Sequence, residues 1–377
     1  MKQPTILIMG GSGNTGRPLS RLLLQNSEVN LALGGRNLEK AQNLASEFNR
    51  EFEGNRVKGI QVEAADVKSL HSAFEGVDFV VLASSTTEYI PLAAQAALDA
   101  RIGYLDIQYS SRKIRFLKEI ETLIQQAGCC FITDGGFHPG LPAFMVRYAA
   151  QFFDEIELAR VGSVIKQDWR NLEVADSTII ELLDLMNDFE MSIYTAGRWK
   201  RLSWVSTSDY IKMDFGSEFG RQACAPMLLE EMRALPALYP ALRDTGFYVG
   251  SFNWFTDWVI MPVAMVAMKL SPKAAEKPMA RWMHWGLKAF SKPPFATMLQ
   301  VDASGRKDGQ STIVRINISH GDGYMFTAIP VAACLLQYLD GTTARPGLWW
   351  QALCVEPSRF MSDMERMGIK VSRNSGG

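Results

Sequence analysis

The glycine cluster GGSGNTG at residues 10–16 constrains the fold of this chain more than any other feature. It stands between an apolar run at 5–9 and a helix pattern at 18–26, and a second apolar run follows at 29–33. Because glycine lacks a Cβ atom, such a loop turns sharply and brings its backbone N–H groups close to a phosphate. The order strand, glycine loop, helix, strand predicts a unit that binds a dinucleotide, with the pyrophosphate at the N-terminus of the first helix.

Strand and helix patterns alternate as far as about residue 133. Helix patterns cover 38–52, 67–74, 90–100 and about 113–127, and strand patterns cover 59–63, 78–83, 104–107 and 129–133. This alternation predicts an α/β fold, in which residues 1–136 form a Rossmann domain on a doubly wound parallel sheet of about six strands.

Beyond residue 136 the alternation is lost, and tryptophan and methionine become frequent. Strand patterns cover 156–165, 191–205, 296–302 and 311–319, and a polar turn at 304–309 joins the last two. These segments predict a second, α+β domain over 137–327 with a mixed or antiparallel sheet. Helix patterns resume at 328–339 and at about 357–367.

The glycine loop and the loops after the third and fourth strands supply candidate cofactor-binding residues, because ligands of such folds lie at the carboxyl ends of the strands. We expect Asp66 and Val67 beside the adenine. We expect Ala83, Ser84 and Ser85 beside the pyrophosphate or the nicotinamide ribose. The candidates in the glycine loop are Gly10, Ser12, Gly13, Asn14, Thr15 and Gly16.

The residues at the end of the second strand bear on the choice between NAD and NADP. NAD-specific sites usually carry an acidic residue here for the ribose 2′-hydroxyl. This chain has Arg36 and Asn37 instead, and a guanidinium pairs well with a 2′-phosphate. The sequence therefore predicts NADP as the cofactor. The alternative is that Arg36 is a solvated charge ahead of a helix.

Several segments of the chain resemble the saccharopine dehydrogenase-like family of NADP-dependent oxidoreductases. The resemblance covers most of the chain and is carried by the segments at 10–17, 34–41, 109–111, 134–142, 327–330, 346–349 and 367–369. It implies that the second domain carries the substrate contacts and the dimer interface, and that the tail 328–377 packs back on the first domain.

The chain departs from that family in the loop at the domain junction. It has His138 where saccharopine reductases carry aspartate, and Pro142 and Ala143 where they continue with Asp-His. The family's contacts to an amino-acid substrate are therefore not carried over, and saccharopine is not assigned as the substrate.

Reduction by NADPH requires a proton donor beside the carbon that receives the hydride. The candidate donors are His138, at the domain junction, and Tyr109, after the fifth strand. Asp134 is a candidate to orient His138 across the loop. The alternatives are that His138 only bonds the backbone and that Asp134 caps a turn.

Tyr109 and Lys113 have the YxxxK spacing of the short-chain dehydrogenases, in which both side chains share one helix face. A catalytic serine normally precedes that pair, and residues 90–100 supply none. We therefore interpret the spacing as a coincidence. A short-chain-type isomerase that uses Tyr109 and Lys113 is kept as a third hypothesis.

Composition argues against several classes of partner. With 39 basic and 40 acidic residues, no global field draws the chain to nucleic acid or to an anionic surface. The five cysteines form no CxxC clip, and His71, His284 and His320 lack metal-ligand spacing, so no metal is predicted. The first strand begins at residue 5, which leaves no room for a signal peptide, and we expect a cytoplasmic protein.

Residues 252–285 are unusually rich in tryptophan and methionine. Their longest apolar stretch, 258–270, is shorter than the roughly 20 residues that span a bilayer. Four roles are open for such a segment: a pocket for a hydrophobic substrate, a dimer interface, a peripheral membrane contact, or ordinary core.

Together these features predict a homodimeric NADP(H)-dependent oxidoreductase of the saccharopine dehydrogenase-like group. Its substrate is a small molecule with a C=C, C=N or C=O bond, and an apolar one if residues 252–285 line the pocket. The rival hypothesis is a sensor or scaffold protein that binds NADP(H) without turnover, and the lack of a clear catalytic dyad favours it.

Overall fold

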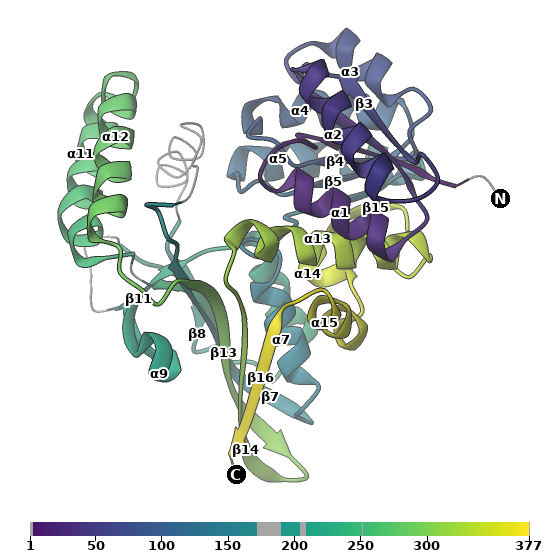
Figure 1. Cartoon of the computed structure of the whole chain (residues 1–377). Coiled ribbons are helices and arrows are strands. Elements are labelled where there is room, and N and C mark those ends of the chain that lie inside the picture. Colours follow the sequence, from purple (N-terminus) through teal and green to yellow (C-terminus); the bar gives the residue numbers. More distant parts are fainter. Residues whose placement is uncertain (1–2, 172–189, 204–208, 251, 377) are drawn as a thin grey trace. The chain divides into compact units, whose positions relative to one another are not determined.

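The computed structural model describes residues 3–171, 190–203, 209–250 and 252–376. The chain forms two compact units, the first from 1–141 with 324–368 and the second from 142–323 with 369–377 (Figure 1). The predicted boundary after residue 136 lies in the loop that precedes this division. The predicted tail 328–377 is split between the units, because its last residues form a strand of the second sheet.

A parallel sheet of seven strands forms the centre of the first unit, in the order β15-β6-β5-β4-β1-β2-β3. The strands are β1 (Thr5–Met9), β2 (Asn30–Gly35), β3 (Val57–Gln61), β4 (Phe79–Leu82), β5 (Gly103–Asp106), β6 (Cys130–Thr133) and β15 (Gly347–Trp350). Every residue of β1, β4, β5 and β6 is buried, as expected of a parallel sheet that helices cover on both faces. The predicted doubly wound parallel sheet is confirmed.

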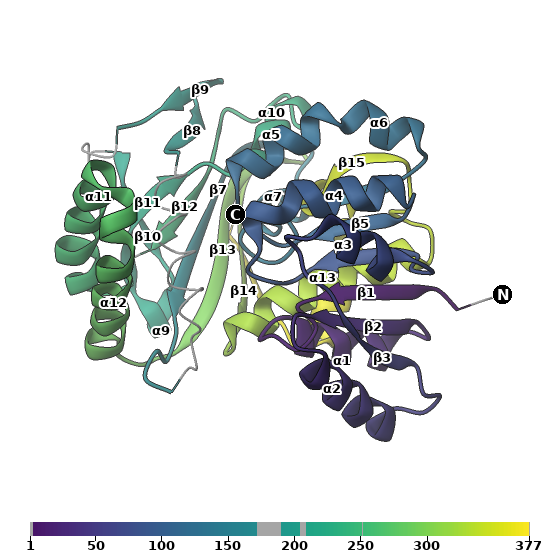
Figure 2. The ribbon, with the colours of Figure 1, turned by 90° about the horizontal axis from the view of Figure 1, so that it is seen from above.

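The helices of the first unit lie on both faces of this sheet. They are α1 (Gly16–Asn26), α2 (Leu38–Glu51), α3 (Val67–Phe74), η1 (Thr87–Tyr89), α4 (Ile90–Asp99), α5 (Ser111–Glu119), α6 (Glu121–Gln126), α13 (Gly323–Leu339), α14 (Gln351–Cys354) and α15 (Pro357–Arg366). Helices α1 and α2 cover one face, and α3 and α4 cover the other (Figure 2). The single helix predicted over 113–127 is two helices, because the backbone leaves helical geometry at Ile120.

Strand β15 extends the sheet beyond the six strands that the sequence predicts. It pairs in parallel with β6, with Gly347 opposite Cys130. Its four residues, GLWW, are too short for a periodic pattern, and their partner strand lies far away in the sequence. No local signal identifies such a strand.

A mixed sheet of nine strands forms the second unit, and it confirms the predicted α+β class. The main order is β10-β11-β12-β7-β13-β14-β16, and β8 pairs with β12 and β9. The strands are β7 (Glu155–Lys166), β8 (Ser192–Thr195), β9 (Arg198–Arg201), β10 (Ile211–Asp214), β11 (Arg221–Met227), β12 (Asp244–Gly250), β13 (Ala296–Lys307), β14 (Gln310–His320) and β16 (Lys370–Gly376). Strands β12 and β7 are parallel, and the other pairs are antiparallel.

Two predicted strands of the second unit differ from the structure in detail. The segment 191–205 is a hairpin of β8 and β9, which turns at Ala196 and Gly197, both at positive φ; residues 204 and 205 lie outside the described residues. The polar turn at 304–309 is shorter than expected, because β13 and β14 continue to a turn at Asp308 and Gly309.

The helices of the second unit are α7 (Pro142–Ala150), α9 (Gly216–Phe219), η3 (Glu230–Ala234), α10 (Leu235–Leu238), η4 (Thr256–Ile260), α11 (Met261–Leu270) and α12 (Pro272–Phe290). Helices α11 and α12 lie side by side as an antiparallel pair (Figures 1 and 2). In the described part of the chain, no helix is long and apolar enough to cross a membrane.

Candidate cofactor-binding and active site

The predicted cofactor and catalytic residues gather at one edge of the first sheet. Because β1 to β6 are parallel, the loops that leave their carboxyl ends lie on the same edge. Strand β1 lies between β4 and β2, so the chain proceeds outward from β1 in both directions across the sheet. Ligands of doubly wound sheets bind at this point of reversal. The structure therefore places the predicted residues where a dinucleotide binds in folds of this type.

The glycine loop packs too tightly for side chains at two of its positions. Gly10 has φ of +82°, and a Cβ atom there would lie 2.8 Å from the Cβ of Ser84, in the loop after β4. A Cβ atom at Gly16 would lie 2.1 Å from the carbonyl oxygen of Gly10. The loop closes on itself through a 2.8 Å hydrogen bond from the N–H of Gly13 to the same oxygen. This packing keeps the start of α1 close to the end of β1.

The N-terminus of α1 is suited to an anion. Its N-cap residue is Thr15, whose side chain makes no capping hydrogen bond, and the first turn holds no acidic residue. The partial positive charge of the helix end is therefore not neutralised by a capping side chain or an acidic residue of the first turn, as a pyrophosphate site requires. The glycine cradle and this helix end fit the group that the sequence predicts.

Arg36 is exposed and directly follows β2. Asn37 caps α2, since its side chain accepts a hydrogen bond of 2.8 Å from the N–H of Lys40. Tyr89, in η1, lies within electrostatic range of Arg36. The pKa of Tyr89 is raised because its hydroxyl bonds to Glu88, while Arg36 acts in the opposite direction. Sequence patterns gave no reason to connect Tyr89 with this edge.

The loops after β3 and β4 carry the other predicted cofactor residues. Asp66 caps α3 by accepting a 2.9 Å hydrogen bond from the N–H of Lys68, and Val67 is exposed beside it. Ser84 is hydrogen-bonded to Thr86 at 2.9 Å between their hydroxyl oxygens. Both loops are thus ordered by their own side chains.

Gln108, which is not among the predicted site residues, joins the loops after β4 and β5. Its Nε2 donates to the carbonyl oxygens of Leu82 at 3.1 Å and of Ser84 at 2.6 Å. The side chain is buried, so these bonds are shielded from water. The only signal in the sequence is its position soon after the fifth strand.

A buried ionic cluster joins the ends of β5 and β6 to α5. The ammonium of Lys113 lies 2.6 Å from Oδ1 of Asp106 and 2.6 Å from Oδ1 of Asp134, and it also donates to the carbonyl oxygen of Gln108. Thr133 donates to Asp106 at 2.9 Å. Burial alone lowers the pKa of Lys113, but the two carboxylates outweigh burial and raise that pKa.

This cluster bears directly on the YxxxK spacing. Tyr109 precedes α5, which is capped by Ser110 and begins at Ser111, so Tyr109 and Lys113 are not one turn apart on a helix. The three protons of the Lys113 ammonium have three acceptors within the protein. None is left for a ribose, which supports the interpretation of the spacing as a coincidence.

His138 lies in the loop after β6. Its ring stacks on Phe137 with centroids 5.5 Å apart, and Phe137 stacks on Phe326 of α13. Burial lowers the pKa of His138 from its usual 6.5 to about 4. At neutral pH the imidazole is therefore uncharged, and it can accept a proton or donate a neutral hydrogen bond, but it is not a charged acid.

The backbone around His138 is held by a residue from the distant end of the chain. Gln351 of α14 accepts a hydrogen bond from the N–H of Gly136 at 3.1 Å and donates to the carbonyl oxygen of Gly136 at 3.0 Å. Its Nε2 also reaches the carbonyl oxygen of Gly140. No local pattern in the sequence points to Gln351, because such patterns do not relate residues so far apart.

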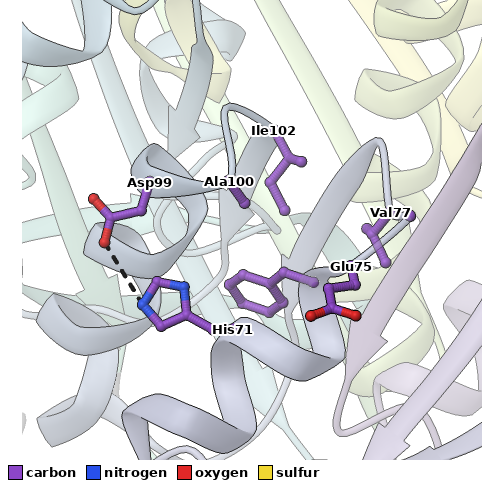
Figure 3. Close-up of a pocket in the computed structure, with 8 residues that line it drawn as sticks. His71, Glu75, Val77, Asp99, Ala100 and Ile102 are labelled. Atoms are coloured by element: carbon purple, nitrogen blue, oxygen red, sulfur yellow. Dashed lines mark ion pairs between the residues drawn. The ribbon is translucent and has the colours of Figure 1, made fainter.

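A separate pocket of about 360 Å³ lies at the opposite edge of the first sheet (Figure 3). It is lined by the ends of α3 and α4 and by the residues that lead into β4 and β5. His71 and Asp99 form an ion pair of 3.7 Å at its rim. The pocket contains none of the predicted site residues. Among the described residues, no group of three His, Cys, Asp or Glu side chains could hold a metal ion.

Comparison with known proteins agrees with this geometry. The fold and the cradle define a nucleotide-binding protein of the Rossmann class. Residues 6–127 match the family model of the saccharopine dehydrogenase NADP binding domain. Residues 6–127 therefore form an NADP-binding domain of the saccharopine dehydrogenase type, in agreement with the predicted family and cofactor. No curated protein matches the chain in sequence.

One solved structure shares the fold over the whole length of the chain, and others are similar at lower TM-scores. The apo saccharopine dehydrogenase (L-Glu forming) of Saccharomyces cerevisiae has a TM-score of 0.70 at 14% identity, with 100% of both chains covered. The C. glutamicum DAP dehydrogenase in complex with DAP has a TM-score of 0.47 at 13% identity, with 97% of this chain and 99% of that chain covered. The first likeness extends the shared fold to the second unit.

We expect Lys113→Met to destabilise the first unit strongly. The substitution leaves two carboxylates buried without their cation, which typically costs about 3 to 5 kcal/mol. Arg115→Met, at an exposed position of the same helix, is the matched control and should change stability by less than about 0.5 kcal/mol. Urea unfolding followed by circular dichroism measures both. Similar small losses in the two variants would show that the cluster contributes little.

We expect His138 to make stability depend on pH. Because its pKa falls from 6.5 to about 4 on folding, its contribution is complete above pH 6.5 and is lost as the pH falls towards 4. Between pH 7.5 and 5 the wild type should lose about 2 kcal/mol relative to His138→Gln. Urea midpoints of both proteins across this range test the expectation, and parallel curves would contradict it.

Proposed function

We propose that this protein is an NADP(H)-dependent oxidoreductase that transfers hydride to or from a C=C, C=N or C=O bond of a small molecule. The observation that carries the proposal is the uncapped N-terminus of α1, which meets the glycine cradle at the reversal of the strand order. The match of residues 6–127 to an NADP-binding domain supports it.

The site residues divide between binding and proton handling. The glycine loop residues 10–16 and α1 hold the pyrophosphate, Arg36 with Asn37 faces the 2′-phosphate, and residues 66–67 and 83–85 flank the adenine and the ribose. The nicotinamide supplies or accepts the hydride when the cofactor is bound. Tyr109 and His138 are the proposed groups that exchange a proton with the substrate.

The uncharged state of His138 at neutral pH limits the roles that it can take in proton transfer. An imidazole whose pKa is about 4 is ready to accept a proton at neutral pH. It therefore fits a base that assists oxidation of the substrate, or a neutral donor that hydrogen-bonds a carbonyl. Asp134 is paired with Lys113, so in this proposal it holds the loop that carries His138, as a positioning residue.

A sensor without turnover is the second candidate function. The observation in its favour is that Lys113, the ammonium at the ends of β5 and β6, is committed to Asp106 and Asp134 and is not available as an acid. The cofactor would bind in the same cradle, without a proton from Lys113. The predicted homodimer, the cytoplasmic location and the membrane contact of residues 252–285 belong with either function as proposals.

One set of assays separates these functions. NADPH binding by calorimetry at micromolar protein tests the cradle, and NADPH oxidation or NADP reduction is assayed against carbonyl, imine, enoyl, amine and alcohol compounds. Turnover that falls in His138→Ala or Tyr109→Phe supports the oxidoreductase. Binding without turnover of any compound supports the sensor, and absence of binding contradicts both.

We expect Arg36→Asp to weaken the binding of NADPH far more than the binding of NADH. Losing a charged contact to the 2′-phosphate should reduce NADPH affinity by about tenfold to a hundredfold, while NADH lacks that phosphate. Arg50→Asp, at the far end of α2, is the control and should leave both affinities unchanged within about twofold. Equal losses for the two cofactors in Arg36→Asp would show that this residue does not read the phosphate.

A further inference from the structure

The hairpin of residues 254–290, which comprises η4, α11 and α12, exposes apolar side chains that an ordinary surface helix would bury. Helix α11 packs Ala264 and Met268 inward, where they are 1% and 5% exposed. On its other side Val263 is 45%, Val266 is 53% and Leu270 is 79% exposed. Since these positions are three or four residues apart, they form one apolar stripe on the outside of the helix.

Tryptophans extend this apolar surface. Trp254, Trp258 and Trp285 are 63%, 65% and 52% exposed. Phe255 and Phe290 stack at 4.5 Å between their centroids, and both contact the rings of Trp254 and Trp285. The aromatic side chains are therefore held in place while large parts of two indoles face solvent. Exposed apolar area of this extent usually marks a contact surface.

The same hairpin is basic, although the whole chain has a formal net charge of -1. Its only acidic residues are Asp257 and Glu276, and Asp257 is turned inward, where Oδ1 accepts a hydrogen bond from the N–H of Phe252. On α12 the exposed residues Lys277, Arg281 and Trp285 are spaced four apart and share a face. The basic residues from 254 to 292 are Lys269, Lys273, Lys277, Arg281, Lys288 and Lys292.

We propose that this hairpin docks the protein on an anionic lipid surface. Indoles favour the boundary between lipid headgroups and acyl chains, an apolar stripe enters that boundary, and each lysine or arginine near the surface contributes about 1 kcal/mol. Helix α11 has 10 residues and is about 15 Å long, too short to span a bilayer. It therefore lies along the surface.

The positive charge of this face favours a lipid surface over a second copy of the chain as the molecule that binds there. A symmetric dimer through this face would bring the basic stripe of α12 close to its own copy, and like charges oppose such pairing. Anionic headgroups complement the same stripe. The docking proposal uses no residue of the cofactor site in the first unit, so it stands or fails separately from the proposed oxidoreductase.

The test is co-flotation of the full chain with phosphatidylcholine vesicles that contain or lack phosphatidylserine. Wild-type protein should bind the anionic vesicles, bind them more weakly at high salt, and shift its tryptophan emission to shorter wavelength. Two double variants probe the two contributions: Val266→Ser with Leu270→Ser, and Lys277→Glu with Arg281→Glu. Each should reduce partitioning by at least about tenfold.

Matched controls change the same chemistry elsewhere on the surface. Leu123→Ser with Ile313→Ser removes two exposed aliphatic side chains, and Lys58→Glu with Lys68→Glu reverses two exposed charges. Both should stay within about twofold of wild type. Circular dichroism and thermal unfolding verify that every variant is folded.

Three outcomes would overturn the proposal. The first is that the wild type does not bind anionic vesicles. The second is that the hairpin variants bind them as well as the wild type does. The third is that vesicles are not bound and light scattering shows a dimer, which the Val266→Ser with Leu270→Ser variant abolishes. The last result would assign the face to a second copy. None of these outcomes changes the NADPH assays, so the two proposals remain separable.

Discussion

A buried ammonium held between two carboxylates fixes the part of the site where chemistry is proposed. Lys113 binds Asp106, at the end of β5, and Asp134, directly after β6, so one cation joins two neighbouring strand ends. A cluster with two acids and one base, removed from water, is stable only when its hydrogen bonds are complete. Here the hydroxyl of Thr133 and the backbone N–H of Asp134 supply further donors to Asp106. The cluster fixes these two loops by making any departure from this arrangement costly.

The cofactor cradle depends on a different constraint, the close approach of backbones. Gly10 packs against Ser84 so tightly that even a methyl group would collide, and Gln108 holds the same Ser84 loop from the side of β5. The cradle and the ionic cluster are thus linked through Gln108, whose carbonyl oxygen accepts a hydrogen bond from Lys113. Pyrophosphate binding and proton transfer are assigned to neighbouring loops that share this support.

Local patterns predicted the first unit well and its supporting contacts poorly. The glycine loop and six strands follow from periodicity and from the conformational freedom of glycine, which act over a few residues. The spacing of Lys113 from Tyr109 says nothing of its partners, which are Asp106 and Asp134 on two different strand ends. Gln351 and β15 come from the far end of the chain, and their roles exist only once the sheet has formed. Tertiary contacts of this kind leave no periodic trace.

The hairpin of residues 254–290 shows why a whole-chain charge is a poor guide to surfaces. A net charge of -1 rules out long-range attraction to an anionic surface, as the composition suggested. Screening, however, limits electrostatics to about 8 Å at physiological salt, so only charges beside a contact matter there. Lys277 and Arg281 lie on the exposed face of α12, while the nearby Asp257 is turned inward. The sequence of an apolar helix such as α11 is typical of a buried core helix. Only the exposure of Val266 and Leu270 in the structure shows that the helix has a second, solvent-facing apolar side. The docking proposal therefore rests on local charge and exposure together, rather than on composition.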